Sequence, residues 1–253
     1  MIETLLVLDS SFIDDETFKW YSLTSVFGAN RRHKQAYLDV HRKSNACLRN
    51  GLWKDLEAII ITSVEERVST LVSFSKSVVD QNPWERISSV PTKLQAADDT
   101  VGSPSVEVCL FSLVQNFVGH LTTSSLTGSE FLEHYPSMLD DLWSFDNGFK
   151  YLIIGFPCWF PIPSLTKAHL ARQRLKTGFN AFHKALDQVA VGDEPEFPWR
   201  DMGDVSAVMK GRSAVWRAHR LSHGVKGACD LDLLWKSVLH PGALTVSADM
   251  HVV

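Results

Sequence analysis

The chain has 253 residues, a mass of 28.4 kDa and a formal net charge of −4, from 25 basic and 29 acidic residues. Hydrophobic residues make up 45% of the chain. This is enough apolar surface to offset the entropy of ordering, so a mainly disordered chain is excluded. The mild acidity, with a pI of about 6.2, provides no excess of positive charge for a phosphate backbone, so we expect no nucleic-acid partner.

The cysteines and the apolar runs bear on the compartment. Four cysteines lie far apart, with no C-x-x-C pair among them: Cys47, Cys109, Cys158 and Cys229. This spacing is typical of reduced thiols in an intracellular protein. The apolar run at 5–8 is too short for a signal peptide, and the longest run, 151–163, contains three prolines. We therefore expect no transmembrane segment.

Apolar residues recur at steps of three and four along much of the chain, and this spacing predicts amphipathic helices. We expect helices at 32–48, 53–76, 106–122, 137–152, 165–188 and 202–219, a short helical start at 230–235, and a short strand within 84–94. Four pairs act as stops: Asn50-Gly51, Asn82-Pro83, Gly192-Asp193 and Pro241-Gly242. The sequence thus predicts an all-α fold in a single domain, 1–253, with a disordered tail at 243–253.

Each of the main predicted helices has an expected buried face. The inward stripes are Leu56, Ile59, Ile60, Val64, Val68 and Leu71; Val108, Phe111, Val114, Val118 and Leu121; Leu139, Leu142, Phe145, Phe149 and Leu152; Ala171, Leu175, Phe179, Phe182 and Leu186; and Val205, Val208, Met209 and Trp216. Charged residues expected in solvent are Asp140, Asp141, Asp146, Arg172, Arg174, Lys176 and Lys184. The serine-rich segment 121–129 is expected to end the third helix, and Cys47 and Cys109 are interpreted as small buried hydrophobes.

The segment 155–164, GFPCWFPIPS, combines three prolines with four large apolar side chains. The prolines prevent regular helix. The apolar members are Phe156, Trp159, Phe160 and Ile162. So apolar a loop needs to contact core, ligand, partner or membrane, and we expect these four side chains to form the most exposed apolar patch.

Motifs of common enzyme classes are absent from the sequence. It contains no phosphate-binding loop, no G-x-G-x-x-G and no G-x-S-x-G. His219 and His223 have the spacing of two metal ligands on one helix, but Arg220 stands where a zinc hydrolase has its glutamate, and Cys229 is the only obvious third ligand. We interpret the two histidines as a solvated helix end and expect no metal.

Residues 126–216 carry a series of landmarks in a fixed order. These are Phe131-Leu132 with Tyr135-Pro136, Phe145-Asp146, Phe156-Pro157-x-Trp159 with Pro161 and Pro163, Ala168-His169, and Ala171-Arg172. In the order and spacing of these landmarks, the chain resembles the middle of fungal secondary-metabolism members of the cytochrome P450 superfamily. These proteins are heme-thiolate monooxygenases. The resemblance covers roughly residues 10 to 235, and the sequence departs from the family's pattern from Lys236 to Gly242.

The resemblance implies a partial helical fold in which segment 155–164 joins two lid helices over a substrate channel and touches the membrane, here the surface of the endoplasmic reticulum. It implies four channel positions: Phe149, Leu152, Phe156 and Trp159. His41 and Arg42 become candidates for contact with the heme propionates, although an exposed basic helix face is the favoured interpretation for both. The reaction implied for the family is oxidation of an apolar metabolite with heme, O₂ and a reductase.

The family's catalytic motifs do not occur in the chain. There is no E-x-x-R pair and no F-x-x-G-x-R-x-C-x-G loop to supply the thiolate ligand. We therefore expect a truncated monooxygenase-like protein that is inactive alone and binds no heme by itself. The alternative is a non-catalytic helical binding protein for an apolar ligand, a partner chain or a membrane surface. An enzyme with new chemistry in the old pocket is a third interpretation.

Overall fold

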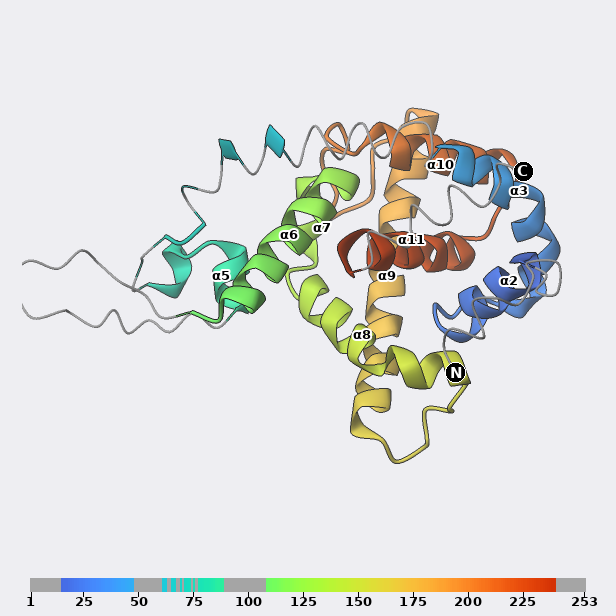
Figure 1. Cartoon of the computed structure of the whole chain (residues 1–253). Helices are drawn as coiled ribbons and strands as arrows, with labels where there is room; N and C mark the ends of the chain where they lie inside the picture. Colours follow the sequence, from blue (N-terminus) through green and yellow to red (C-terminus); the bar gives the residue numbers. More distant parts are fainter. Residues whose placement is uncertain are drawn as a thin grey trace, which may run out of the picture. The chain divides into compact units, whose positions relative to one another are not determined.

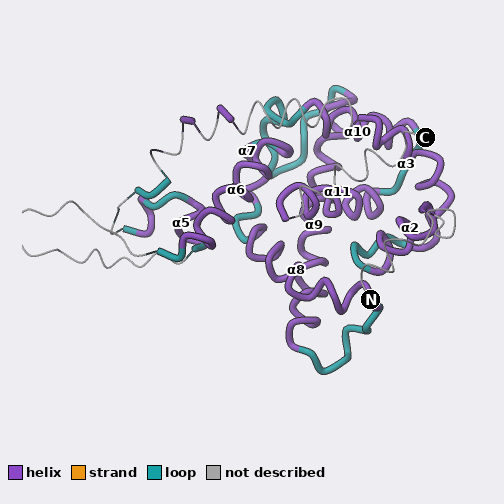
Figure 2. Tube along the Cα trace, in the orientation of Figure 1, coloured by secondary structure: helices purple, strands orange, loops and turns teal. Residues whose placement is uncertain are grey.

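The structure, a computed structural model, describes residues 15–47, 61–62, 65–66, 69, 71–73, 75, 77–88 and 108–239. Within these ranges it contains nine α-helices and no strand, so the all-α prediction is confirmed (Figure 2). The helices are α2 (Asp15–Ser25), α3 (Lys34–Cys47), α5 (Pro83–Ile87), α6 (Leu110–Thr127), α7 (Ser129–His134), α8 (Met138–Ile154), α9 (Pro163–Val191), α10 (Ala207–Ala218) and α11 (His223–Leu239) (Figure 1). The predicted tail 243–253 lies outside the described residues.

The chain divides into two compact units, which are described separately below. The first consists of Met1–Ala46, Asp141–Pro195 and Gly211–Trp235. The second consists of Cys47–Asp140, Glu196–Lys210 and Lys236–Val253. Helices α2, α3, α9 and most of α8 and α11 therefore belong to the first unit, and α5, α6 and α7 belong to the second.

Helix α9 is the longest element of the first unit, with 29 residues. Pro163 begins it, where the missing N–H of proline costs nothing. Gly192 ends it with a φ of 92°, the left-handed conformation that glycine adopts most easily. The predicted inward stripe is confirmed, since all five members are buried: Ala171, Leu175, Phe179, Phe182 and Leu186.

Helices α8 and α11 bring aromatic side chains into the core of the first unit. The Phe149 ring stacks on Trp235 at a centroid distance of 4.3 Å. Phe27 contacts Phe145 at 5.7 Å and Trp235 at 6.0 Å. The indole N–H of Trp235 donates to Asp146 Oδ1 at 2.9 Å, so this partly buried ring has a polar partner. These contacts join α8, α11 and the segment after α2.

The core of the second unit forms around Trp84. Four buried side chains pack together there: Trp84, Leu113, Phe117 and Leu121. Three partly buried side chains pack against this cluster: Leu71, Val72 and Val108. The Trp84 indole N–H donates to the Leu71 carbonyl at 2.9 Å. A second contact region surrounds Trp199, whose ring lies 5.0 Å from His134 and 6.2 Å from Phe131.

The predicted buried face of α6 is wrong for Phe111, Val114 and Val118, whereas Leu121 is buried as predicted. Phe111 is 76% exposed, and Val114 and Val118 are also exposed, whereas Leu113 and Phe117 are buried. Trp84 contacts the stripe that contains Leu113 and Phe117, and this contact decides which face lies inward. Cys109 at the start of α6 is likewise exposed rather than buried.

Helix α6 ends within the serine-rich segment 121–129, as predicted, but it continues to Thr127 instead of ending at residue 122. Three hydroxyls donate to the carbonyl four residues earlier: Thr123 to Gly119, Ser125 to Leu121, and Thr127 to Thr123. Bonded in this way, hydroxyl side chains remain compatible with helix. Gly128, with φ 82°, then separates α6 from α7.

Two predictions concern residues 53–94, of which the structure describes only a part. Residues 61–62 and 65–66 are helical, but 71–73 and 75 are not, so the second predicted helix does not reach residue 76. There the Ser73 N–H donates to Glu85 instead of a helical carbonyl, at 2.9 Å. A short strand was expected within 84–94; its first residues belong instead to α5, which Asn82 caps and Pro83 begins, and residues 89–94 lie outside the described residues. The apolar positions from Leu56 to Val68 lie outside the described residues.

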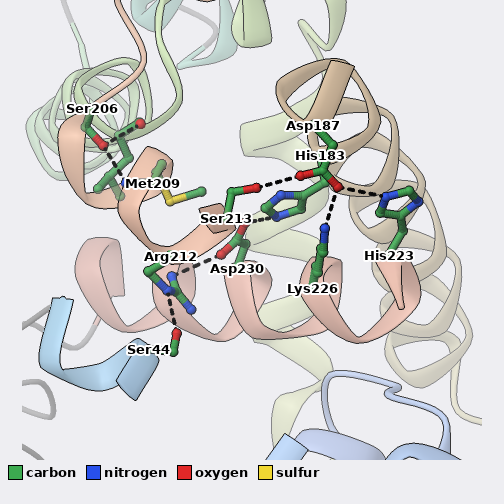
Figure 3. A network of polar contacts seen from close by, with 11 residues as sticks. Ser44, His183, Asp187, Ser206, Met209, Arg212, Ser213, His223, Lys226 and Asp230 are labelled. Carbon is green, nitrogen blue, oxygen red and sulfur yellow. Dashed lines mark hydrogen bonds and ion pairs between the residues drawn. The ribbon is translucent and has the colours of Figure 1, made fainter. Parts of the chain in front are cut away.

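The last two helices differ in length from the predictions. Helix α10 begins at Ala207 instead of 202, because Asp201 binds the Gly203 N–H in a turn and Ser206 Oγ accepts the Met209 N–H at the helix start (Figure 3). The short helical start at 230–235 is part of a longer helix, α11, from His223 to Leu239. The predicted burial of Val205, Val208, Met209 and Trp216 is confirmed.

Candidate functional site

The residues predicted to line a channel occupy two different settings in the first unit. Phe149 and Leu152 lie on α8, where Phe149 stacks on Trp235 and Leu152 is fully buried. Phe156 and Trp159 lie on the following loop, and both contact Phe160, at 4.8 Å and 6.3 Å between ring centroids. Their role as channel residues stays a prediction.

The two heme-propionate candidates lie on α3. The His41 ring is half-buried and lies 5.0 Å from the Tyr37 ring. Arg42 belongs to the same helix, and its side chain lies outside the described part of the structure. Their proposed contact with heme stays a prediction.

The predicted helical pair His219 and His223 does not share a helix. His219 follows the end of α10, His223 begins α11, and Arg220 between them has a φ of 53°. The Nε2 atom of His219 lies 3.3 Å from Lys43 Nζ, whereas Nε2 of His223 lies 3.2 Å from Asp187 Oδ2. Among the described residues, no group of three or more His, Cys, Asp or Glu side chains is arranged to hold a metal ion.

A polar network that sequence reasoning missed joins α9, α10 and α11 (Figure 3). Its first centre is Asp230 on α11, which contacts His183 Nε2 of α9 and lies 3.0 Å from Arg212 of α10. Arg212 Nε also donates to Ser44 of α3 at 3.3 Å. His183 has no exposed surface, and Asp230 and Arg212 are almost fully buried. The Arg212–Asp230 contact is an ion pair without well-aligned hydrogen-bond geometry.

The second centre is Asp187, one turn after His183 on α9. Its Oδ2 accepts a hydrogen bond of 2.5 Å from the buried Lys226, and its Oδ1 accepts one of 3.0 Å from Ser213. His223 and Arg217 lie at 3.2 Å and 3.5 Å. Burial by itself raises the pKa of Asp187, but the hydrogen bonds and charge of Lys226, with those from His223 and Ser213, outweigh it and lower that pKa below 3.8.

The geometry of the network indicates a structural rather than a catalytic role. A general base must reach a substrate proton, whereas the His183 ring is enclosed by Phe182 at 5.6 Å and Trp216 at 5.2 Å. Buried pairs of this kind fix which helix faces meet, and breaking one leaves a charge without its partner. The signal in the sequence was weak: charged residues four apart, at 183 and 187 and at 226 and 230, on helices that are otherwise apolar at these faces.

The loop between α8 and α9 is the more promising functional surface. Trp159 in this loop is 78% exposed, and Ile154 before it and Leu170 after it are also exposed. Phe156, Phe160 and Ile162 are half-buried instead, so the prediction of a patch made of all four loop side chains is wrong. The contacts of Phe156 and Phe160 with each other, and of Phe156 with Tyr151, withdraw them from solvent.

The charge around this loop has one sign. From Asn147 to Leu186 the sequence contains no Asp or Glu, and it contains six basic residues: Lys150, Lys167, Arg172, Arg174, Lys176 and Lys184. A chain with a net charge of −4 therefore carries a 40-residue hairpin of charge +6. This asymmetry was readable from the sequence.

Three of the basic residues on α9 and one aspartate on α8 have partners that helix periodicity did not predict. Arg172 and Lys176 are half-buried against the end of α2: Arg172 donates to the carbonyls of Ser25 and Val26, and Lys176 donates to that of Gly28. Asp141, expected in solvent, is buried and accepts hydrogen bonds from Arg174 Nε and NH2. The predicted fully solvated basic face is therefore wrong for Arg172 and Lys176.

Within the described part of the chain, no helix combines the length and apolarity needed to cross a bilayer, in agreement with the sequence prediction. Comparisons of the chain with protein-family models, with curated proteins and with solved structures each returned no match. The likeness to heme-thiolate monooxygenases rests on the sequence landmarks alone.

Proposed function

We propose that this chain is a non-catalytic helical protein, similar in plan to the lid half of heme-thiolate monooxygenases, that binds an anionic membrane surface through the loop joining α8 to α9. The observation that carries the proposal is the exposed Trp159, which lies in an apolar loop within a 40-residue segment, 147–186, that has no acidic residue. Amphipathic aromatic rings favour the boundary between headgroups and acyl chains.

The apolar contribution comes from a few side chains. Trp159 is 78% exposed and Ile154 is 68% exposed, on either side of the bend that leads into α9. Fully burying one large apolar side chain is worth about 1.5–3 kcal/mol. Insertion of Trp159 and Ile154 thus gives a weak, reversible attachment rather than a permanent one.

The charged contribution comes from the basic residues around the loop. Each Lys or Arg close to an anionic surface adds about 1 kcal/mol, and the effect falls off within a Debye length. Lys167 is exposed on the first turn of α9, and Lys150 lies over the Tyr151 ring near the end of α8. Both flank the apolar loop in the sequence and add positive charge next to its apolar residues.

The test is co-sedimentation of the whole chain with vesicles of phosphatidylcholine and phosphatidylserine. We expect Trp159→Ser to weaken binding about tenfold, which corresponds to the loss of one buried aromatic side chain. We also expect binding of the unaltered chain to fall steeply as salt is raised. Vesicles of phosphatidylcholine alone should bind the chain much more weakly.

The matched control is Phe111→Ser, which removes an exposed aromatic ring from α6, in the other unit. We expect this variant to bind vesicles as the unaltered chain does. Equal binding by Trp159→Ser and the unaltered chain would falsify the proposal. Loss of binding in Phe111→Ser alone would assign the contact to the exposed stripe of α6.

A further inference from the structure

Two cations of α9, Arg172 and Lys176, meet at the C-terminal end of α2. Arg172 NH1 donates to the Ser25 and Val26 carbonyls at 2.9 Å and 3.0 Å, and Lys176 Nζ donates to the Gly28 carbonyl. These bonds satisfy carbonyl groups that the end of α2 leaves open. They account for the position of the two side chains but use only part of their hydrogen-bonding capacity.

The charge of this pair is largely uncompensated. Among the described residues neither Arg172 nor Lys176 forms an ion pair with a carboxylate, and the end of α2 offsets only about half an elementary charge. Burial lowers the pKa of both groups, and the charge of Arg172 lowers that of Lys176 further. An anion placed between them relieves this repulsion.

The two cations converge beside Gly28. A Cβ atom at Gly28 would lie 3.2 Å from Arg172 Nε and 3.4 Å from Lys176 Nζ, so both nitrogens face the space beside this residue. The Nε–H of Arg172 has no partner among the described residues, and Lys176 uses one of its three ammonium protons. A positive φ of 71° makes glycine the favoured residue there.

The pair is also connected to the loop that carries Trp159. Arg172 NH2 lies 2.9 Å from His169 Nδ1, and His169 Nε2 lies 3.4 Å from the Phe156 carbonyl. Arg172 is therefore linked through His169 to the start of the loop at Phe156.

We propose that Arg172 and Lys176, which converge beside Gly28, bind the phosphate group of an anionic membrane lipid. The inference rests on the proposed function, because the loop brings the pair to the bilayer surface. A phosphate monoester such as the headgroup of phosphatidic acid fits best, since guanidinium and ammonium groups both donate to phosphate oxygens and its charge matches theirs. A soluble phosphate has the same chemistry but gains nothing from the loop.

The experiment uses the unaltered chain and measures acetylation of individual lysines by an amine-reactive reagent, resolved by mass spectrometry. The reaction is run in buffer, with phosphatidylcholine vesicles, with vesicles that also contain phosphatidic acid, and with inorganic phosphate. Lys184, exposed two turns further along α9, is the internal reference. Co-sedimentation is measured in the same samples.

We expect phosphatidic acid vesicles to slow acetylation of Lys176 about tenfold, the effect of one charge-assisted hydrogen bond, with little change at Lys184. Phosphatidylcholine vesicles and inorganic phosphate should have a much smaller effect at Lys176. Equal protection by inorganic phosphate overturns the lipid assignment and identifies a soluble-phosphate site.

Capture of the chain by the vesicles without protection of Lys176 overturns the phosphate site and leaves the proposed function standing. Absence of capture refutes the proposed function and, with it, the lipid assignment. As a second readout, Lys176→Gln should weaken binding to phosphatidic acid vesicles more than Lys184→Gln, which removes the same charge. Equal losses in the two variants would mean that only the total charge of α9 matters, and would overturn the site.

Discussion

Asp187 and Asp230 lie on facing helices and each holds buried cations, but their surroundings differ. Asp230 contacts His183 and Arg212 in the interior, whereas Asp187 keeps some exposure and collects Lys226, Ser213, Arg217 and His223. When a buried charge loses its partner, its desolvation is no longer offset, and the folded state is destabilised. At this scale, stability depends on intact pairs rather than on the number of charges.

Replacing Asp230 by Asn should destabilise the chain by about 3–5 kcal/mol, because Arg212 then keeps its buried charge without a counter-ion. Asp141→Asn is the matched control, since Asp141 pairs with Arg174, whose side chain is 61% exposed. That change should cost about 0–1 kcal/mol. Urea unfolding measures both values, and equal costs would refute a structural role for the Asp230 pair.

The Asp187 pair makes stability depend on pH. The folded pKa of Asp187 lies below its ordinary value of 3.8, so its contribution is fully present above that value and is lost as pH falls through the folded pKa. Asp187→Asn should cost about 2 kcal/mol at neutral pH, less than a fully buried pair because Asp187 is partly exposed.

Urea unfolding from about pH 7 down to about pH 3 tests this dependence. The difference between Asp187→Asn and the unaltered chain should shrink only at the acidic end. Asp193→Asn, on the exposed segment after α9, serves as the control for loss of one negative charge. A difference that grows as the pH falls would contradict the assigned direction of the pKa change.

Helices α8 and α9 approach each other closely where Gly148 faces Ala168. A Cβ atom at Gly148 would lie 2.3 Å from the Ala168 Cβ, closer than two carbon atoms can pack. The helix α11 offers a contrast, because nothing lies within 4 Å of a Cβ at Gly224. The same substitution should therefore have opposite effects on the two helices.

Gly148→Ala should destabilise the chain by about 1–3 kcal/mol through overpacking. Gly224→Ala should be neutral or stabilising by up to about 1 kcal/mol, because alanine is the better helix former. Thermal unfolding followed by circular dichroism compares the two variants. Equal effects would contradict the close approach of α8 and α9.

The orientation of α6 makes a separate prediction. Leu113→Ala should cost about 2–5 kcal/mol, since Leu113 packs in the buried cluster with Trp84. Phe111→Ala should change the free energy of unfolding by less than about 0.5 kcal/mol, since Phe111 is mostly exposed. A larger loss of stability for Phe111→Ala than for Leu113→Ala would instead support the buried face that periodicity predicted.

The sequence allowed some of these features to be predicted and not others, for physical reasons. Helix α9 has a single apolar stripe opposite charged residues, so its buried face was predicted correctly. Helix α6 contains no charged residue and carries two apolar stripes, so only its contact with Trp84 distinguishes them. Asp187 and Lys226 look like solvated charges because they are 39 residues apart and meet only after folding.

At the scale of the whole molecule, the absence of the E-x-x-R pair and the thiolate loop from the sequence predicts that this chain forms no heme-thiolate complex. The chain should be mixed with heme, reduced and exposed to CO. We expect no red-shifted Soret band of a thiolate-ligated heme. A band of this kind that disappears in a Cys→Ser variant would restore the monooxygenase interpretation.

Membrane docking through the loop is the central claim. Two native cysteines allow it to be measured without introducing a new cysteine. Cys158 is exposed beside Trp159, and Cys109 is exposed at the start of α6 in the other unit. A charged, water-soluble maleimide reacts with each thiol at a rate that reports access from water. Mass spectrometry resolves the two rates in the presence and absence of anionic vesicles.

We predict that vesicles of phosphatidylcholine and phosphatidylserine slow alkylation of Cys158 about tenfold, as expected for a thiol held at the depth of an inserted Trp159. The rate at Cys109 should stay the same, because α6 takes no part in the contact. Unchanged alkylation of Cys158 on vesicle-bound chain, or slowing at Cys109 instead, would contradict the account.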